Sequence, residues 1–322
     1  MSDTPVVTEA WLPGFDGHQF YTRTYPAADS SAPRGVILFV HGFAEYTARY
    51  AHVHRIWAAR GYTLFTYDQR GFGQTAVDLE HRSKGSAYGK TCLRDQLSDV
   101  QWWVQYLKGQ YPDSPLFLMG HSMGGALSLA FATRVKAPPS PETVQMLSGI
   151  IASSPFLEQT TPVSRLLRWV GEKAAMVLPH MPFPAEVLPE HLSHDPVVNE
   201  AAANDPLLKQ RGTLRGLADM LNLGEQLLWN DYKRWPKQIP LLILHGTDDK
   251  IASCKAVEEF YGKLDAEDKK ISLYSDGYHE LANEPDGVKE KFVDECIEWV
   301  EARLSRRLGE VPEASNIPVS RL

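Results

Sequence analysis

Apolar residues occur along this chain in short continuous runs that alternate with longer amphipathic stretches. The runs fall at residues 36–40, 62–67, 116–119, 149–152, 241–244 and 271–274. Such runs are typical of strands that are buried on both faces. Residues 46–59, 93–107 and 123–135 instead carry apolar side chains at helical spacing. The alternation predicts an α/β fold with a mostly parallel central sheet that is flanked by helices.

Three segments depart from this alternation. Residues 6–12 and 18–25 flank the turn sequence PGFDG, which predicts an opening hairpin, and residues 286–308 predict a closing amphipathic helix. Residues 156–235 hold an apolar helical stretch at 166–178 and then a segment interrupted by five prolines. We expect one core domain of residues 1–155 and 236–308, a cap of residues 156–235 and a polar tail of residues 309–322. The alternative for 156–235, an interdomain linker, fits its apolar content poorly.

Composition narrows the classes of function. Of 322 residues, 43% are hydrophobic and 23% are charged, which is typical of a globular protein. The net charge of −7 argues against a nucleic-acid partner. No signal peptide and no apolar stretch long enough to span a membrane is found. The three cysteines form no CxxC pair, so we expect buried, unreactive thiols in a reducing compartment.

The clearest chemical motif follows the run at residues 116–119. That run leads directly into Gly120-His121-Ser122-Met123-Gly124, and a helical pattern begins at once. The motif is a nucleophile elbow, a strained turn in which a side chain at either glycine would collide with a neighbouring element. The alternative is a chance match in a glycine-rich loop. We expect the hydroxyl of Ser122 to stand above the sheet as a nucleophile.

A serine nucleophile needs a histidine to take its proton and an acid to orient that histidine. With this elbow the order along the chain is serine, acid, histidine. Asp248 and Asp249 follow the run at 241–244, and His279 follows the run at 271–274. Order alone leaves both carboxylates open, whereas His279 is the only histidine that lies after both of them.

The oxyanion of an acyl-transfer reaction needs two amide donors. One should belong to Met123, the residue after the nucleophile. The other should come from the loop that follows the third strand, where we choose Phe43.

The remaining histidines have simpler interpretations. His41 and His121 stand beside glycine turns and are expected to pack or hydrogen-bond locally. His191, His194 and Asp195 could imitate a metal site, but they lie in the proline-rich segment, and we expect no metal ion there.

Together these motifs resemble the α/β-hydrolase fold family and, within it, the monoglyceride lipases, the fungal forms more than the mammalian ones. The similar stretches are GHSMGG, HGFAEYTARY, YDQRGFGQT, the paired SHDP and NDPLL segments of the cap, and the loops HGTDDKI and DGYHELANE. The resemblance extends over residues 11–308.

The resemblance implies a role for each matching position. Ser122 would be the nucleophile and His279 the general base and acid. Asp249, selected over its neighbour by the HG-x-x-D spacing, would orient the histidine. Phe43 and Met123 would supply the two oxyanion amides.

Two other pairs lie in the matching loops. Glu45 and Arg49 fall where the family places polar groups at the glycerol end of the substrate pocket. Asp68 and Arg70 are expected to form an ion pair that supports their loop.

The activity that the resemblance implies is hydrolysis of a monoacylglycerol, a single-chain acylglycerol, to fatty acid and glycerol through an acyl-serine intermediate. Neither a cofactor nor a metal is expected. A lysophospholipase, a broad carboxylesterase or a proline iminopeptidase could use the same triad, because the fold does not fix the substrate. A non-catalytic receptor of this fold is a further alternative. No obligate protein partner is inferred.

The sequence of the cap gives information about where the protein is located in the cell. Its helical stretch contains Leu166, Leu167, Trp169, Val170, Met176, Val177 and Leu178. These side chains could line an acyl channel and contact a membrane or lipid droplet, or they could pack onto the sheet. The resemblance implies a cytoplasmic protein with peripheral contact to lipid. The C-terminal Ser320-Arg321-Leu322 is similar to a peroxisomal address, which gives the peroxisome as an alternative.

Overall fold

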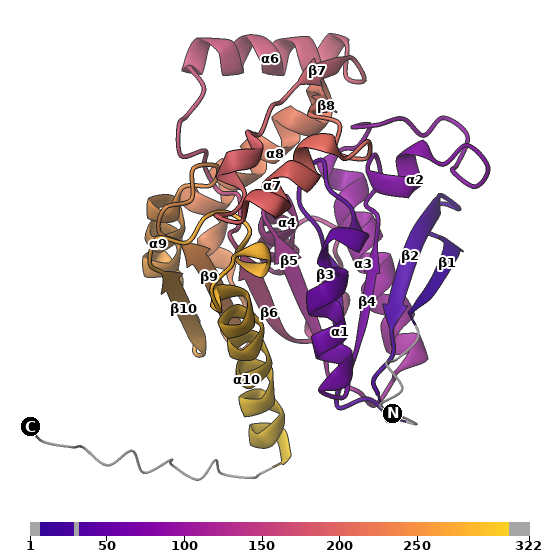
Figure 1. Ribbon diagram of the computed structural model, residues 1–322, viewed down its shortest axis with the longest axis vertical. Helices are drawn as coiled ribbons and strands as arrows, with labels where there is room; N and C mark the ends of the chain where they lie inside the picture. Colours follow the sequence, from indigo (N-terminus) through magenta and orange to yellow (C-terminus); the bar gives the residue numbers. More distant parts are fainter. Residues whose placement is uncertain (1–6, 29–31, 309–322) are drawn as a thin grey trace, which may run out of the picture.

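The computed structural model describes residues 7–28 and 32–308, and it is organised around an eight-stranded sheet (Figure 1). The strands of this sheet are β1 (Thr8–Pro13), β2 (Gln19–Tyr25), β3 (Gly35–Val40), β4 (Tyr62–Tyr67), β5 (Leu116–His121), β6 (Leu147–Ser153), β9 (Leu241–Gly246) and β10 (Lys269–Tyr274). Their order across the sheet is β1-β2-β4-β3-β5-β6-β9-β10. The β1–β2 and β2–β4 pairs are antiparallel, and all the other pairs are parallel. The predicted hairpin and parallel sheet are confirmed.

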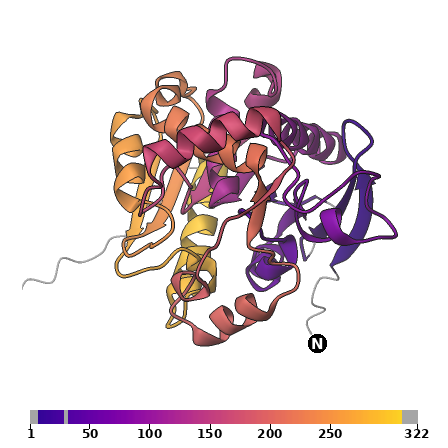
Figure 2. The ribbon, with the colours of Figure 1, turned by 90° about the horizontal axis from the view of Figure 1, so that it is seen from above.

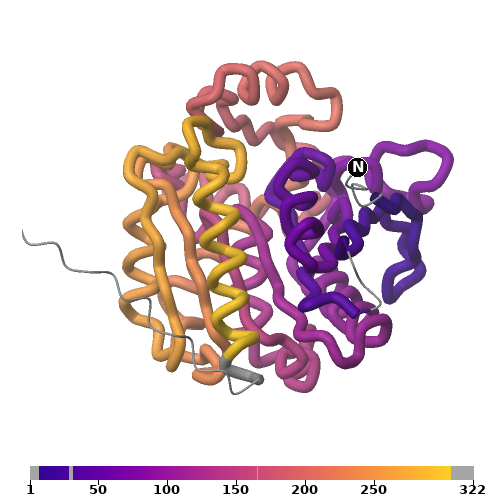
Figure 3. The backbone as a smooth tube through the Cα atoms, turned by 60° about the horizontal axis from the view of Figure 1, so that its bottom comes forward, coloured from indigo at the N-terminus to yellow at the C-terminus, as the bar shows by residue number. Residues whose placement is uncertain are grey.

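Helices cover both faces of the sheet (Figure 1). Those of the core are α1 (Ala51–Ala59), α2 (Gly73–Val77), α3 (Leu93–Gln110), α4 (Met123–Thr133), α5 (Pro141–Gln145), α9 (Cys254–Lys263) and α10 (Val288–Leu308), with the 3₁₀ turns η1 (Thr47–Tyr50) and η4 (Leu281–Asn283). Figure 3 shows α10 running along the sheet.

The alternation of side chains along a strand gives the sheet two apolar cores. On one face Leu38 of β3 packs in the core that contains Trp103 of α3. On the other face the neighbours of Leu38, Ile37 and Phe39, pack with Trp57 of α1. All six residues of β3 are buried, because both faces of this strand are covered. The prediction of strands that are buried on both faces is confirmed for β3 and wrong for β10, where Leu273 is 39% exposed.

Residues 156–235 lie over the carboxyl ends of the parallel strands, as Figures 1 and 2 show. This segment contains α6 (Arg165–Val177), β7 (Pro182–Pro184), η2 (Pro189–His191), α7 (Pro196–Asn204), β8 (Arg211–Thr213), α8 (Leu214–Trp229) and η3 (Asp231–Arg234). The helix predicted over 166–178 is confirmed as α6. The proline-rich stretch is more regular than predicted, because Pro196 occupies the first turn of α7, where its missing N–H costs nothing.

The apolar side chains of α6 neither pack onto the sheet nor line an acyl channel, whereas the expected contact with a lipid surface stays a prediction. Leu166, Met176 and Val177 are 72%, 73% and 78% exposed, so they do not pack onto the sheet. No residue of α6 is among the described residues that line the cavity beside Ser122, so this helix does not form an acyl channel there. Within α6 only Ala175 is classed as buried among the side chains described.

The expected ion pair between Asp68 and Arg70 is wrong. Arg70 donates to Asp99, with Nη2 and Oδ1 2.8 Å apart. The carboxylate of Asp68 instead accepts the backbone N–H groups of Thr47 and Gln74, at 2.8 and 2.7 Å. Asp68 therefore stabilises its loop through amide donors, which satisfy a buried carboxylate without a cation.

None of the helices in the described ranges combines the length and the apolar character that a membrane span requires. The tail predicted at residues 309–322, including Ser320-Arg321-Leu322, lies outside the described residues.

Candidate active site

The nucleophile elbow joins β5 to α4. Ser122 has φ 53° and ψ −117°, a left-handed conformation that is rare and strained for a residue with a side chain. A Cβ on Gly120 would lie 2.2 Å from the carbonyl oxygen of Gly124, and a Cβ on Gly124 would lie 2.2 Å from that of Val40. Both glycines are therefore required by close backbone approach. The Ser122 N–H donates to the carbonyl of Ser153 at 2.9 Å, which ties the turn to β6.

Asp249 and His279 meet at the carboxyl ends of β9 and β10. Nδ1 of His279 lies 2.7 Å from Oδ2 of Asp249. The other oxygen of Asp249 accepts the N–H groups of Ile251 and Ala252, at 2.8 and 2.9 Å. Asp248 points elsewhere and pairs with Lys250 at the surface. The structure thus brings His279 to Asp249 and not to Asp248.

Electrostatics favour the ionised form of Asp249. Burial by itself raises the pKa of this carboxyl group, but the charge on His279 and hydrogen bonds from His245 and His279 outweigh it and hold the pKa far below its usual range. Burial lowers the pKa of His279, and the attraction of Asp249 overcomes this and raises that pKa above its ordinary value. A carboxylate that stabilises an imidazolium in this way is suited to orient a general base.

The loop after β3 approaches the elbow closely. A Cβ on Gly42 would lie 3.0 Å from Cβ of Ser122, so this glycine lets the loop backbone approach Ser122 closely. Ala44 in the same loop has φ 56°, a left-handed conformation at which the backbone changes direction. Within the described chain, no hydrogen bond occupies the N–H of Phe43 or of Met123. Two amides are therefore available near Ser122 for a developing oxyanion.

A cavity of about 350 Å³ opens above these residues. Ser122, His279, Glu45 and Arg49 all line it. Much of the remaining lining is apolar and comes from the loop after β3, from residues 156–235 and from the loop after β9; it includes Phe43, Phe156, Val187, Leu188, Leu192, Leu208, Met220 and Ile251. The cavity therefore joins an apolar wall to a charged end.

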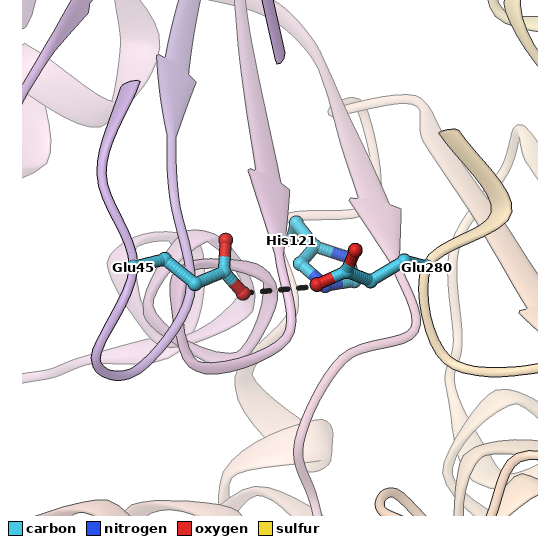
Figure 4. A group of neighbouring side chains, drawn as sticks. All are labelled: Glu45, His121 and Glu280. Carbon is cyan, nitrogen blue, oxygen red and sulfur yellow. Dashed lines mark ion pairs between the residues drawn. The ribbon is translucent and has the colours of Figure 1, made fainter. Parts of the chain in front are cut away.

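The charged end is formed by Glu45, Arg49 and Glu280, which line the cavity. With the buried His121 behind them, they form a group that we call the charge cluster. Figure 4 shows Glu45 and Glu280, from two loops, converging with His121 at the end of β5. Arg49 binds Glu280 through two hydrogen bonds, of 2.6 and 2.9 Å. Oε1 of Glu45 lies 3.7 Å from Nε2 of His121. The rings of His121 and His279 are 4.8 Å apart, so the cluster adjoins the candidate base.

The two carboxyl groups of the cluster differ in charge state. Burial raises the pKa of Glu45 to about 7, and neither Arg49 nor the hydrogen bond from Tyr50 reverses this. Burial also acts on Glu280, but the direct pairing with Arg49 dominates and lowers the pKa of Glu280. Burial lowers the pKa of His121 to about 3, so this imidazole is neutral. Glu280 therefore carries the negative charge, and Glu45 can hold a proton near neutral pH.

The same fold and motifs occur in known proteins. A family model described as serine aminopeptidase, S33 (Hydrolase_4), matches residues 31–286. The chain belongs to this family. It is a serine hydrolase with the α/β-hydrolase fold.

Several proteins that are similar to this S33 hydrolase are named monoglyceride lipases. It is 31% identical over 273 residues to a putative monoglyceride lipase of Schizosaccharomyces pombe, covering 83% of this chain and 68% of that protein. It is 28% identical over 306 residues to the monoglyceride lipase of Saccharomyces cerevisiae, covering 92% and 94%. The crystal structure of a soluble variant of the latter enzyme with a substrate analog superposes with a TM-score of 0.81 at 26% identity, covering 94% of this chain and 97% of that one.

Sequence reasoning missed part of the site of this S33 hydrolase. His121 was expected to pack or hydrogen-bond locally, but its ring lies beside Glu45 and His279, which are distant in the sequence. Glu280 was not identified, although its position directly after His279 is a usable signal. Its partner Arg49 is 231 positions away, and only the fold brings the two together.

The structure does not support a resident metal ion in the charge cluster. Among the described residues, Glu45, His121 and Glu280 form a group whose ligand atoms all lie within 4.8 Å of one another. However, the guanidinium of Arg49 already binds both oxygens of Glu280, so a metal cation would have to displace it. The group therefore does not fit a divalent metal.

The residues with a second metal-like pattern are not assembled into a ligand set. His194 binds Glu284, and Asp195 accepts the N–H of Val197 at the start of α7. His191 lines the cavity instead.

The cysteines differ in part from expectation. Cys296 is buried, whereas Cys92 and Cys254 are half-buried. Burial raises the pKa of Cys254 to about 11, which keeps this thiol protonated at neutral pH. It is therefore a poor nucleophile.

Proposed function

We propose that this S33 hydrolase cleaves the ester bond of monoacylglycerols, with Ser122 as nucleophile, His279 as general base and acid, and Asp249 as the orienting carboxylate. The observation that carries the proposal is the 2.7 Å hydrogen bond between His279 and Asp249 beside a cavity that Ser122 also lines. Two fungal relatives named monoglyceride lipase support this choice of substrate class.

In the proposed reaction, Oγ of Ser122 attacks the ester carbonyl carbon while Nε2 of His279 takes the hydroxyl proton. His279 then gives this proton to the departing glycerol oxygen, which leaves an acyl-serine. Water attacks the acyl-serine with His279 again as base, and the fatty acid departs as the serine regains its proton. The amides of Phe43 and Met123 stabilise both oxyanions, and loss of one such donor typically costs about a hundred- to a thousandfold in kcat.

The composition of the cavity supports a single-chain substrate. Val187, Leu208 and Met220 offer an apolar wall for an acyl chain. Glu45 and Arg49 lie at the charged end, where we propose that they bind glycerol hydroxyls. Both have partners within the protein, since Arg49 donates to Glu280 and Glu45 accepts the hydroxyl of Tyr50.

A substrate panel tests the proposal. Initial rates would be compared on a monoacylglycerol, a lysophospholipid, a short nitrophenyl ester and a prolyl amide, with Ser122→Ala as control. The prolyl amide is included because the family is described as serine aminopeptidases. The lysophospholipid is included because a Bacillus subtilis relative at 26% identity is named phospholipase YtpA. The highest kcat/KM is expected on the monoacylglycerol, with no activity in Ser122→Ala. A higher value on any other substrate would reject the proposed substrate, and no activity on any of them would reject the reaction.

We further propose that residues 156–235 form a cap whose helix α6 contacts a lipid surface. Leu166 and Met176 are 72% and 73% exposed on this helix. An apolar face of this kind can enter the headgroup boundary of a bilayer. Replacing both residues with Ser should weaken binding to phosphatidylcholine vesicles and spare hydrolysis of a soluble ester. Val135→Ser, with 71% exposure at the opposite end of α4 from the elbow, is the matched control.

Vesicle binding that is unchanged in the Leu166→Ser/Met176→Ser variant would show that α6 is not the surface that binds lipid.

For cellular location, we propose a cytoplasmic protein that contacts lipid droplets or membranes through α6. Imaging of a full-length chain with an internal reporter would separate this location from the peroxisome.

A further inference from the structure

One buried carboxylate, Glu284, connects the loop of His279 to residues 192–195, which we call the latch segment. Glu284 is 2% exposed. Its Oε1 accepts the backbone N–H of Tyr278 at 2.6 Å and lies 3.0 Å from Nδ1 of His194. Its Oε2 accepts the backbone N–H of His194 at 2.9 Å and lies 3.2 Å from the hydroxyl oxygen of Ser193. One side chain thus holds partners from two loops.

The latch segment also binds the histidine loop directly. The N–H of Glu280 donates to the carbonyl of Leu192 at 2.8 Å. The hydroxyl of Ser193 lies 2.9 Å from the carbonyl oxygen of Asn283. The rings of His194 and Tyr278 are 3.7 Å apart. Backbone amides on both sides of His279 are therefore anchored to Glu284 or to the latch segment.

We propose that Glu284 is a positioning residue for His279, which couples the placement of the candidate base to the latch segment of the cap. This inference rests on the proposed function of His279. The side chain of His279 is held by Asp249, and its backbone is held by the amides of Tyr278 and Glu280. A shift of about 1 Å in a reacting group can lower a rate by about a hundredfold.

The chemistry of the contacts requires a carboxylate. Two backbone N–H groups bind Glu284, one on each oxygen: that of Tyr278 donates to Oε1 and that of His194 donates to Oε2. A glutamine has one acceptor oxygen, so its NH₂ group would face either the amide of Tyr278 or that of His194. Donor against donor is repulsive, and one of the two loops would have to move.

The test measures Glu284→Gln on a short nitrophenyl ester. Active sites are counted by fluorophosphonate titration, so that an unfolded fraction does not affect kcat. Glu298→Gln, an exposed carboxylate on α10, is the control. We expect a ten- to hundredfold lower kcat per titrated site, KM changed less than twofold, and the control equal to the wild type.

The pH profile distinguishes positioning from a loss of folding. The charged or titratable groups that act on His279 are Asp249, Glu280, Glu45 and His121. Loosening the contact with Asp249 weakens the attraction that favours the protonated imidazole. The acid limb of kcat/KM should therefore move to lower pH in Glu284→Gln, whereas a purely structural defect lowers the number of active sites without moving this limb.

A second variant keeps the proposal testable if Glu284→Gln does not fold. His194→Ala removes the imidazole that contacts Glu284, from a side chain that is 45% exposed, and keeps the backbone N–H at this position. It should lower kcat per site and shift the acid limb in the same direction, and the double variant should be no worse than Glu284→Gln. Unchanged kcat and pH profile in the variant that folds, or additive effects in the double variant, would overturn the proposal. If the wild type neither reacts with the fluorophosphonate nor hydrolyses the ester, the proposed function is wrong, and this inference is wrong with it.

Discussion

The pair formed by Arg49 and Glu280 offers a direct test of the buried electrostatics. Arg49→Met removes the guanidinium and keeps most of the apolar stem. Glu280 is 0% exposed and would lose both of its hydrogen bonds to Arg49, while Nδ2 of Asn283 would remain 2.7 Å away. Removing one partner of a buried pair costs about 3–5 kcal/mol. Since Asn283 still donates, we expect about 3 kcal/mol, which lowers Tm by roughly 6–12 °C in a chain of this size.

Thermal and urea unfolding would measure this loss, with Arg49→Met/Glu280→Gln as the matched control. The double variant removes both charges, so it should recover most of the lost stability. Because pairing lowers the pKa of Glu280 in the folded protein, the pair stabilises above the ordinary value of 4.5, and this contribution is lost as pH falls through the lowered value. The deficit of Arg49→Met should therefore shrink in acid. A double variant as unstable as the single one, or a deficit below 1 kcal/mol at pH 7, would refute this reasoning.

Three other predictions follow from the triad and the elbow. Asp249→Asn should lower kcat on a nitrophenyl ester by about a thousand- to ten-thousandfold with little change in Tm, because asparagine favours the wrong tautomer of His279; a loss below tenfold would contradict this. In the wild type, kcat/KM should fall in acid with a midpoint above 6.5, since Asp249 raises the pKa of His279, and a midpoint below 6.5 would contradict it. Gly124→Ala should destabilise by about 3 kcal/mol or more, because its Cβ would meet a carbonyl oxygen at 2.2 Å. Gly171→Ala is the control, because its Cβ would meet nothing within 4 Å, and it should be neutral or mildly stabilising. Unfolding experiments that find Gly171→Ala less stable than Gly124→Ala would contradict this prediction.

The features that were predicted from sequence are local ones. The elbow around Ser122 needs only a strand, two glycines and a helix in succession, and each of these leaves a pattern within a few residues. The strands that precede Asp249 and His279 are short apolar runs, so their carboxyl ends could be located. Parallel strands end at the same edge of a sheet, and this explains why three distant loops could be expected to meet.

The features that were missed depend on tertiary contacts. No local pattern shows that Arg70 turns to Asp99 rather than to Asp68, or that Arg49 meets Glu280. The spacing of apolar residues predicted the helix α6 but not its exposure, because an apolar stripe does not show which surface covers it. Similarly, Glu284 gains its importance only from the latch segment, about ninety positions earlier.

The central claim is that Ser122 is activated by His279 and Asp249, and one labelling measurement tests it most directly. The wild type and His279→Ala would be treated with a fluorophosphonate at neutral pH, digested, and mapped by mass spectrometry. We expect one label per wild-type chain, on Ser122, and at least a hundredfold slower labelling of the variant. A label on another serine, or equal labelling rates in the two proteins, would contradict the account.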